Sequence, residues 1–163
     1  MNRLCIACLF LVLVAWGLPQ AAAQDDNPWK SWDEAYALAR QHDRNVFYFI
    51  FSTKCSSCKK VFTEHFARPE ISSLVLNYYV PVLAEVDLEK DVIVHYKGQS
   101  LTQDSLQKKL LELANFTEPG YKLPLLFVVE PRDAGDDRVV YAHGYLELND
   151  LMAFIDKNRR GTR

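Results

Sequence analysis

The stretch KCSSCKK at residues 54–60 decides the fold, because it directly follows the apolar run VFYFIF at residues 46–51. The run is long enough for a strand, and its unbroken apolar character is typical of a central strand covered on both faces. Apolar residues then recur at helical spacing over 61–66. Cys55 and Cys58 are therefore predicted at a junction where a buried strand leads into a helix.

This junction favours a reactive thiol at the first cysteine. The unpaired N–H groups and the dipole of a helix N-terminus favour a thiolate over a thiol, so Cys55 is predicted to be the attacking sulfur. Cys58 lies one turn further into the helix and can reach back to the same sulfur, which predicts that it is the resolving thiol. Lys54, Lys59 and Lys60 add positive charge nearby, which water and salt screen.

The rest of the chain alternates helical and strand patterns. Ser31-x-x-Glu34 is a capping box that opens the first helix, and Ser100-x-x-Gln103 is predicted to cap a later one. The expected elements are, in order, a helix over 32–42, a strand over 46–51, helices over 55–66 and 70–77, a strand over 78–87, a helix over 101–114, a strand over 123–130, its hairpin partner over 138–145 and a closing helix over 148–155. This order predicts an α/β fold with helices covering a mixed sheet.

The N-terminal segment 1–23 has the pattern of a secretory signal peptide. Arg3 is followed by an apolar core over 4–18 and by Ala21 and Ala23, which are placed as an A-x-A cleavage signal. An uncleaved membrane anchor is the alternative, but an apolar stretch of about 15 residues is shorter than the roughly 20 that span a bilayer. We therefore expect a periplasmic or otherwise exported protein that is soluble after cleavage.

Cleavage would leave a single domain over 24–163 whose only cysteines are Cys55 and Cys58, because Cys5 and Cys8 leave with the signal peptide. An oxidising compartment permits a disulfide, but a loop this short constrains the unfolded chain little, so a purely structural role is the weaker interpretation.

The chain has 19 Lys and Arg against 21 Asp and Glu residues, a net charge of −2. This balance argues against binding to nucleic acids, whose phosphates require a basic patch.

With these features the chain resembles the thioredoxin superfamily, and within it the exported SoxW-like thioredoxins. The resemblance rests on the buried strand before CSSCKK, on EVD at 85–87, on LPLLFVVE at 123–130 and on HGYLELNDLMAFI at 143–155. It implies a three-layer thioredoxin-like sandwich. The stretch over 88–122 departs from the family because it is longer than in thioredoxin itself, and we interpret it as a helical insertion beside the active site, before the cis-proline strand, that selects partners. A passive packing helix is the alternative.

The resemblance also implies a substrate-binding edge. Pro124 is expected to be the cis-proline facing the cysteines, and the Leu123 backbone is expected to pair with a bound substrate strand. We place Lys54, next to the first cysteine, with these substrate-binding residues. A trans proline at an ordinary strand start is the alternative at position 124.

Three positions depart from the thioredoxin pattern. Lys54 stands where thioredoxins usually have tryptophan, and Phe49 stands where they usually have a buried aspartate. Leu83 appears in place of the lysine that accompanies that aspartate. Glu85 could act as a base through water, but an exposed carboxylate at the strand end is the favoured interpretation, because carboxylates are rarely buried without partners.

The predicted reaction is thiol–disulfide exchange through a Cys55–Cys58 dithiol and disulfide cycle, with no metal or other cofactor. We expect a monomeric reductase of exported disulfide-containing proteins. By resemblance, a membrane thiol transporter of the DsbD/CcdA type would supply its electrons. A disulfide-introducing oxidant is the alternative direction, because a Ser-Ser dipeptide does not determine the potential.

Two other functions remain open from the sequence. An SCO-like metallochaperone would hold copper or zinc with the cysteine pair and His143, or with His65 or His95 in its place. The chain lacks the spacing of a closed four-ligand zinc site. An inert binding module is the second alternative, since Lys54 and Phe49 depart from the pattern of active thioredoxins.

Overall fold

The computed structural model describes residues 27–160. The predicted signal peptide over 1–23, with Cys5 and Cys8, lies outside the described residues, so export stays a prediction. Within the described part of the chain, no helix combines the length and the apolar character needed to cross a bilayer.

Four strands form the central sheet. In spatial order they are β2 (Tyr79–Glu85), β1 (Asn45–Phe51), β5 (Leu125–Glu130) and β6 (Arg138–His143). β1 runs parallel to β2 and antiparallel to β5, and β5 pairs antiparallel with β6. The predicted mixed sheet is therefore confirmed.

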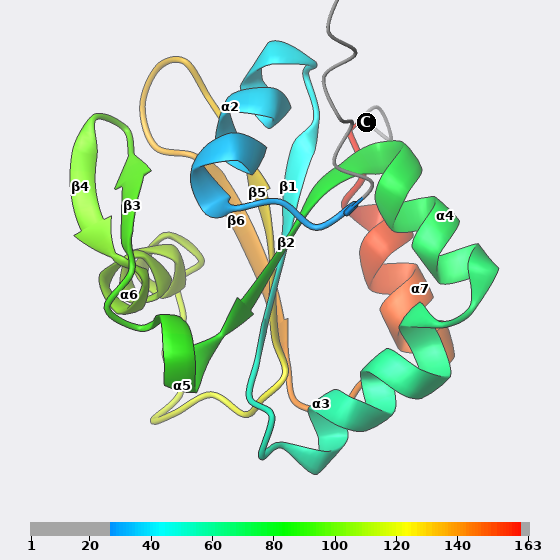
Figure 1. Cartoon of the computed structure of the whole chain (residues 1–163). Coiled ribbons are helices and arrows are strands. Elements are labelled where there is room, and N and C mark those ends of the chain that lie inside the picture. The colour runs from blue at the N-terminus through cyan, green and yellow to red at the C-terminus, as the bar shows by residue number, and fades with distance from the viewer. Residues whose placement is uncertain (1–26, 161–163) are drawn as a thin grey trace, which may run out of the picture.

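Helices cover both faces of this sheet, which confirms the predicted layers (Figure 1). One face carries α2 (Trp32–Gln41) and α6 (Gln103–Leu113). The opposite face carries α3 (Ser56–Lys60), η1 (Val61–Phe66), α4 (Pro69–Tyr78) and α7 (Leu148–Lys157).

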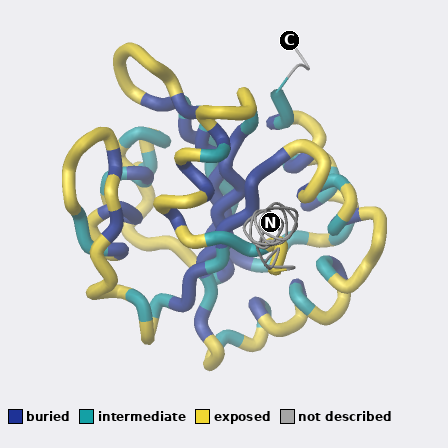
Figure 2. The backbone as a smooth tube through the Cα atoms, turned by 45° about the horizontal axis from the view of Figure 1, so that its top comes forward, coloured by how far each residue is buried: buried dark blue, intermediate teal, exposed yellow. Residues whose placement is uncertain are grey.

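Side chains of β1 alternate between two apolar cores. Val46, Tyr48 and Ile50 pack in the core beneath α2 and α6. Phe47 and Phe49 pack in the other core, and all five side chains are at most 1% exposed. Figure 2 shows the central strands as the buried part of the chain, with exposed residues along the outer helices. Burial on both faces explains why the run carries no charged residue.

The segment 88–122, predicted as an insertion with one helix, also contains a hairpin that the sequence pattern did not predict. β3 (Ile93–Tyr96) and β4 (Gln99–Thr102) pair antiparallel. Lys97 and Gly98 form the turn with φ angles of 49° and 78°, and a type I′ hairpin turn needs two such positive values. Lysine is not a typical residue for the first of these positions, which is why the local sequence does not indicate the turn.

Helix α6 confirms the helix expected over 101–114, but its cap differs from the prediction. The N-cap is Thr102, whose hydroxyl oxygen accepts a hydrogen bond from the Ser105 N–H at 3.1 Å. The capping box predicted from Ser100 was wrong, because Ser100 lies within β4.

Candidate active site

The cysteine pair lies where β1 leads into α3. Cys55 is the N-cap residue of α3, and its sulfur accepts a hydrogen bond from the Cys58 N–H at 3.1 Å. The two residues form a disulfide with their Cα atoms 5.3 Å apart. Cys55 is partly exposed, whereas Cys58 is only 1% exposed. This difference in access favours Cys55 as the sulfur that an external partner reaches, while the roles of both cysteines stay predictions.

The helix after Cys55 continues without a break into a wider π-helical turn. The Lys59 N–H donates to the Cys55 carbonyl at 3.1 Å, and at the far end the Ala67 N–H donates to the Phe62 carbonyl at 3.2 Å. The Cys55 carbonyl thus begins the helix, so the positive end of the helix dipole lies at this residue. A negative charge on the Cys55 sulfur would be stabilised there.

Two of the three lysines around the pair have partners of their own. The Lys54 side chain is 83% exposed, and its Nζ lies 3.6 Å from Asp87 Oδ2. The Lys60 ammonium lies 4.5 Å from the centroid of the Tyr145 ring, and its hydrogen bond with Tyr145 raises the pKa of Lys60. The substrate-binding role of Lys54 stays a prediction.

The carboxylate of Glu85 supports the loop that carries Cys55. Oε1 accepts a hydrogen bond from the Thr53 N–H at 3.1 Å, and Oε2 accepts one from the Leu88 N–H at 2.7 Å. Glu85 is 4% exposed and caps the short helix α5 (Val86–Glu89). The expectation of an exposed carboxylate was therefore wrong. Two backbone donors compensate its burial, which the sequence could not show.

Leu123 and Pro124 lie beside the cysteine pair and are joined by a cis peptide bond. The Ser57 hydroxyl donates to the Leu123 carbonyl at 3.0 Å, and the same oxygen lies 3.2 Å from the Cys55 sulfur. Gly144 directly follows β6 and has a φ of 77°. Its N–H donates to the Pro124 carbonyl at 2.8 Å. The structure thus brings the cysteines and Leu123 together, with Ser57 between them, while pairing with a substrate strand stays a prediction.

Beneath the site, the position of the usual thioredoxin aspartate is filled by an aromatic cluster. Phe49 is fully buried, and its ring makes edge-to-face contacts with Phe62 and Phe66 at centroid distances of 5.0 Å and 5.2 Å. Leu83, at the position of the accompanying lysine, packs partly buried in the same core. No carboxylate and no ammonium group occupies these two positions.

The histidines named for a metal site are held elsewhere. His143 Nδ1 accepts from the Lys122 N–H at 3.1 Å, and its Nε2 lies 3.2 Å from Glu118 Oε1. His65 pairs with the Leu146 carbonyl and His95 pairs with Asp33. Within residues 27–160, no group of three His, Cys, Asp or Glu side chains is arranged to hold a metal ion. The structure therefore shows no third ligand for the cysteine pair in this part of the chain.

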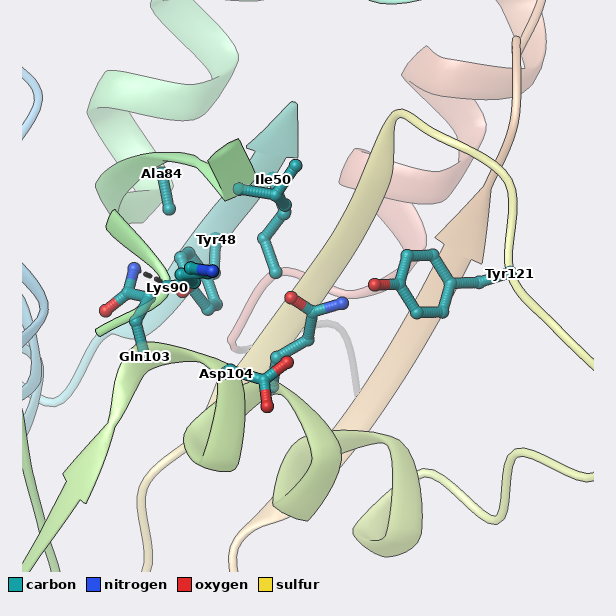
Figure 3. Close-up of a pocket in the computed structure, with 9 residues that line it drawn as sticks. Tyr48, Ile50, Ala84, Lys90, Gln103, Asp104 and Tyr121 are labelled. Atoms are coloured by element: carbon teal, nitrogen blue, oxygen red, sulfur yellow. Dashed lines mark hydrogen bonds between the residues drawn. The ribbon is translucent and has the colours of Figure 1, made fainter. Parts of the chain in front are cut away.

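A pocket opens on the α6 side of the sheet (Figure 3). Its lining includes Tyr48, Gln103 and Tyr121. The Gln103 amide donates to the Tyr48 hydroxyl at 2.6 Å, and burial raises the pKa of Tyr48. Neither cysteine lines this pocket, so it is not part of the candidate active site.

No protein-family model matches the chain, and no curated protein matches it in sequence. Among solved structures, a thioredoxin from Thermus thermophilus superimposes with a TM-score of 0.55 and 22% identity, over 79% of this chain and 84% of that one. The C-terminal domain of Neisseria meningitidis DsbD, in its oxidised form, superimposes with a TM-score of 0.50 and 19% identity, over 77% of this chain and 90% of that one. The chain therefore has a thioredoxin-like fold, while the narrower resemblance to SoxW-like proteins stays a prediction.

Proposed function

We propose that this thioredoxin-like chain is a thiol–disulfide oxidoreductase that reduces disulfides in exported partner proteins. One observation carries the proposal. The partly exposed Cys55 sulfur lies at the start of a helix, bonded to a buried Cys58 and accepting its N–H at 3.1 Å. A sulfur in this position is stabilised as a thiolate when the disulfide is reduced.

The reaction transfers two electrons from the protein dithiol to the substrate disulfide. The Cys55 thiolate attacks one substrate sulfur, the substrate S–S bond breaks, and the released substrate thiolate takes a proton from water. Cys58 then loses its proton, and its thiolate attacks the Cys55 sulfur of the mixed disulfide. The second substrate thiolate leaves and is protonated, and the protein is left with the Cys55–Cys58 disulfide.

A new cycle needs an external dithiol donor. We propose that this donor is a membrane thiol transporter of the DsbD/CcdA type. Its dithiol would reduce the Cys55–Cys58 disulfide by thiol–disulfide exchange and would itself become oxidised. The signal-peptide pattern at 1–23 supports a periplasmic location for both steps. A standard reduction potential measured against glutathione distinguishes this direction from the opposite one, because a reductant has a more negative potential than an oxidant of partner thiols.

Insulin reduction tests the proposed activity. The reduced protein is expected to cleave the insulin disulfides, Cys55→Ser is expected to abolish this, and Cys58→Ser is expected to trap a covalent adduct through Cys55. Ser56→Ala is the matched control, because Ser56 lies exposed between the two cysteines and its side chain makes no hydrogen bond to the residues described here. Insulin reduction that persists in Cys55→Ser would refute the proposal.

A further inference from the structure

The Ser57 hydroxyl stands between the redox sulfur and the proposed substrate-binding edge. Its oxygen lies 3.0 Å from the Leu123 carbonyl oxygen and 3.2 Å from the Cys55 sulfur. Ser57 and Leu123 are 66 residues apart in the sequence, so the fold alone brings these groups together. Ser57 is partly buried, which limits the competition of water for either contact.

A hydroxyl has a single proton to donate, so the two acceptors compete for it. In the disulfide, the Cys55 sulfur is neutral and is a weak acceptor, and the carbonyl oxygen of Leu123 takes the proton. In the reduced protein, a Cys55 thiolate carries a full negative charge, and hydrogen bonds to charged acceptors are the stronger ones. Reduction therefore favours donation from Ser57 to Cys55 and leaves the Leu123 carbonyl free.

We propose that Ser57 couples the redox state of Cys55 to the binding of an extended peptide at Leu123. This inference rests on the proposed function. The reduced protein exposes the Leu123 carbonyl to a backbone N–H of the substrate strand. Once the Cys55 sulfur is neutral again in a disulfide, the Ser57 proton returns to that carbonyl and competes with the strand N–H, which weakens the binding of the strand. The reduced product then leaves when Cys58 has resolved the mixed disulfide. Ser57 is a positioning residue, since it acts through Cys55 and Leu123.

Other charges around Cys55 also affect its thiolate. They include Lys54, Lys59 and Lys60 in its own segment, Glu85 and Asp87 at the end of β2 and in α5, and Lys122 next to Leu123. All of these charges are the same in wild type and in a Ser57 variant. A difference between the two proteins therefore isolates the hydroxyl.

The test uses S-carboxymethylated insulin B chain, an extended peptide that cannot exchange thiols. Its affinity is measured by fluorescence anisotropy for the oxidised and the phosphine-reduced protein. Wild type is expected to bind it about threefold to tenfold more tightly when reduced, which corresponds to one hydrogen bond. Ser57→Ala is expected to bind it equally in both states, Ser57→Thr to keep the preference, and Ser56→Ala to behave as wild type.

The pH dependence separates this coupling from a structural effect. Because the thiolate is the competing acceptor, the preference for the reduced form is expected to grow as pH rises through the pKa of the Cys55 thiol, and to stay flat in Ser57→Ala. An equal preference in wild type and Ser57→Ala overturns the proposal, and so does absence of binding to either wild-type form. Insulin reduction by wild type that persists alongside either result leaves the proposed function standing, so the two failures are distinguishable.

Discussion

The Glu85 carboxylate accepts a hydrogen bond from the Thr53 backbone N–H at 3.1 Å, two residues before Cys55. Its second oxygen accepts the Leu88 N–H at 2.7 Å. One buried side chain therefore joins the loop that carries Cys55 to the end of β2.

Glu85→Gln is expected to lower the free energy of unfolding by about 1–3 kcal/mol, because one of the two backbone N–H groups would face an NH₂ group in place of an acceptor. Urea unfolding measures the loss, and hydrogen exchange at Thr53 and Leu88 shows which bond is broken. Glu64→Gln is the control, since the Glu64 side chain is 51% exposed. Unfolding of Glu85→Gln within about 0.5 kcal/mol of wild type would contradict this account.

Asp87 and Lys54 are expected to differ sharply in their effects on stability, although they form an ion pair. Asp87 Oδ2 accepts the hydroxyl proton of the buried Ser52 at 2.8 Å, so Asp87→Ala leaves a buried donor without its acceptor and costs about 1–2 kcal/mol. Lys54→Ala removes only an exposed charge and changes stability by less than about 0.5 kcal/mol. Equal losses in the two variants, measured by urea unfolding, would show that the ion pair and not the hydroxyl bond matters.

Phe49 cannot be exchanged for the aspartate that thioredoxins usually carry. Phe49→Ala is expected to cost about 3–5 kcal/mol, as is typical for a buried aromatic ring, and Phe49→Leu less. Phe49→Asp is expected not to fold at neutral pH, because its carboxylate would lie unpaired against Phe62 and Phe66. Thermal unfolding followed by circular dichroism measures all three, with Leu88→Ala as control at a side chain that is 79% exposed. A cooperative transition in Phe49→Asp near that of wild type would disprove the expectation.

Alkaline pH is expected to destabilise the protein through its buried tyrosines. Burial raises the pKa of Tyr36, Tyr48, Tyr79 and Tyr96 above the ordinary value of 10.0. A raised pKa in the folded state means that the stability is fully present below about pH 10 and is lost as pH rises towards the folded-state values.

Urea unfolding between pH 8 and pH 11 checks this prediction, with tyrosinate absorbance as a second signal. The free energy of unfolding is expected to begin to fall at about pH 10. Tyr48→Phe removes one of the four groups and is expected to make the loss of stability with pH shallower. For each protein, the free energy of unfolding at higher pH is compared with its own value at pH 8. Tyrosinate absorbance of all eight tyrosines appearing before unfolding would refute the prediction.

Much of the fold follows from local patterns in the sequence. The apolar run at 46–51 predicts the buried central strand, and the spacing of apolar residues predicts the helices, because each period reflects which face of an element is covered. The β3–β4 hairpin is not predicted by these patterns. Its turn at Lys97 and Gly98 has positive φ angles, and lysine is not a residue type that indicates such a conformation.

Part of the candidate site could likewise be predicted from the sequence, and part could not. The sequence places Cys55 and Cys58 at a helix start, and the resemblance points to Leu123 and Pro124. The sequence has two adjacent serines between the cysteines, but it does not distinguish their roles. In the structure Ser56 is exposed, whereas Ser57 contacts both Leu123 and Cys55.

The sequence by itself therefore determined most elements of this protein, though not the β3–β4 hairpin, and the position of its cysteine pair at a helix start, since both depend on neighbours within a few turns of the chain. The tertiary structure alone decided that Glu85 is buried beneath Thr53, 32 residues away, and that Ser57 reaches Leu123, 66 residues away. Such contacts depend on how strands align across the sheet. Residue identity at either end does not encode that alignment.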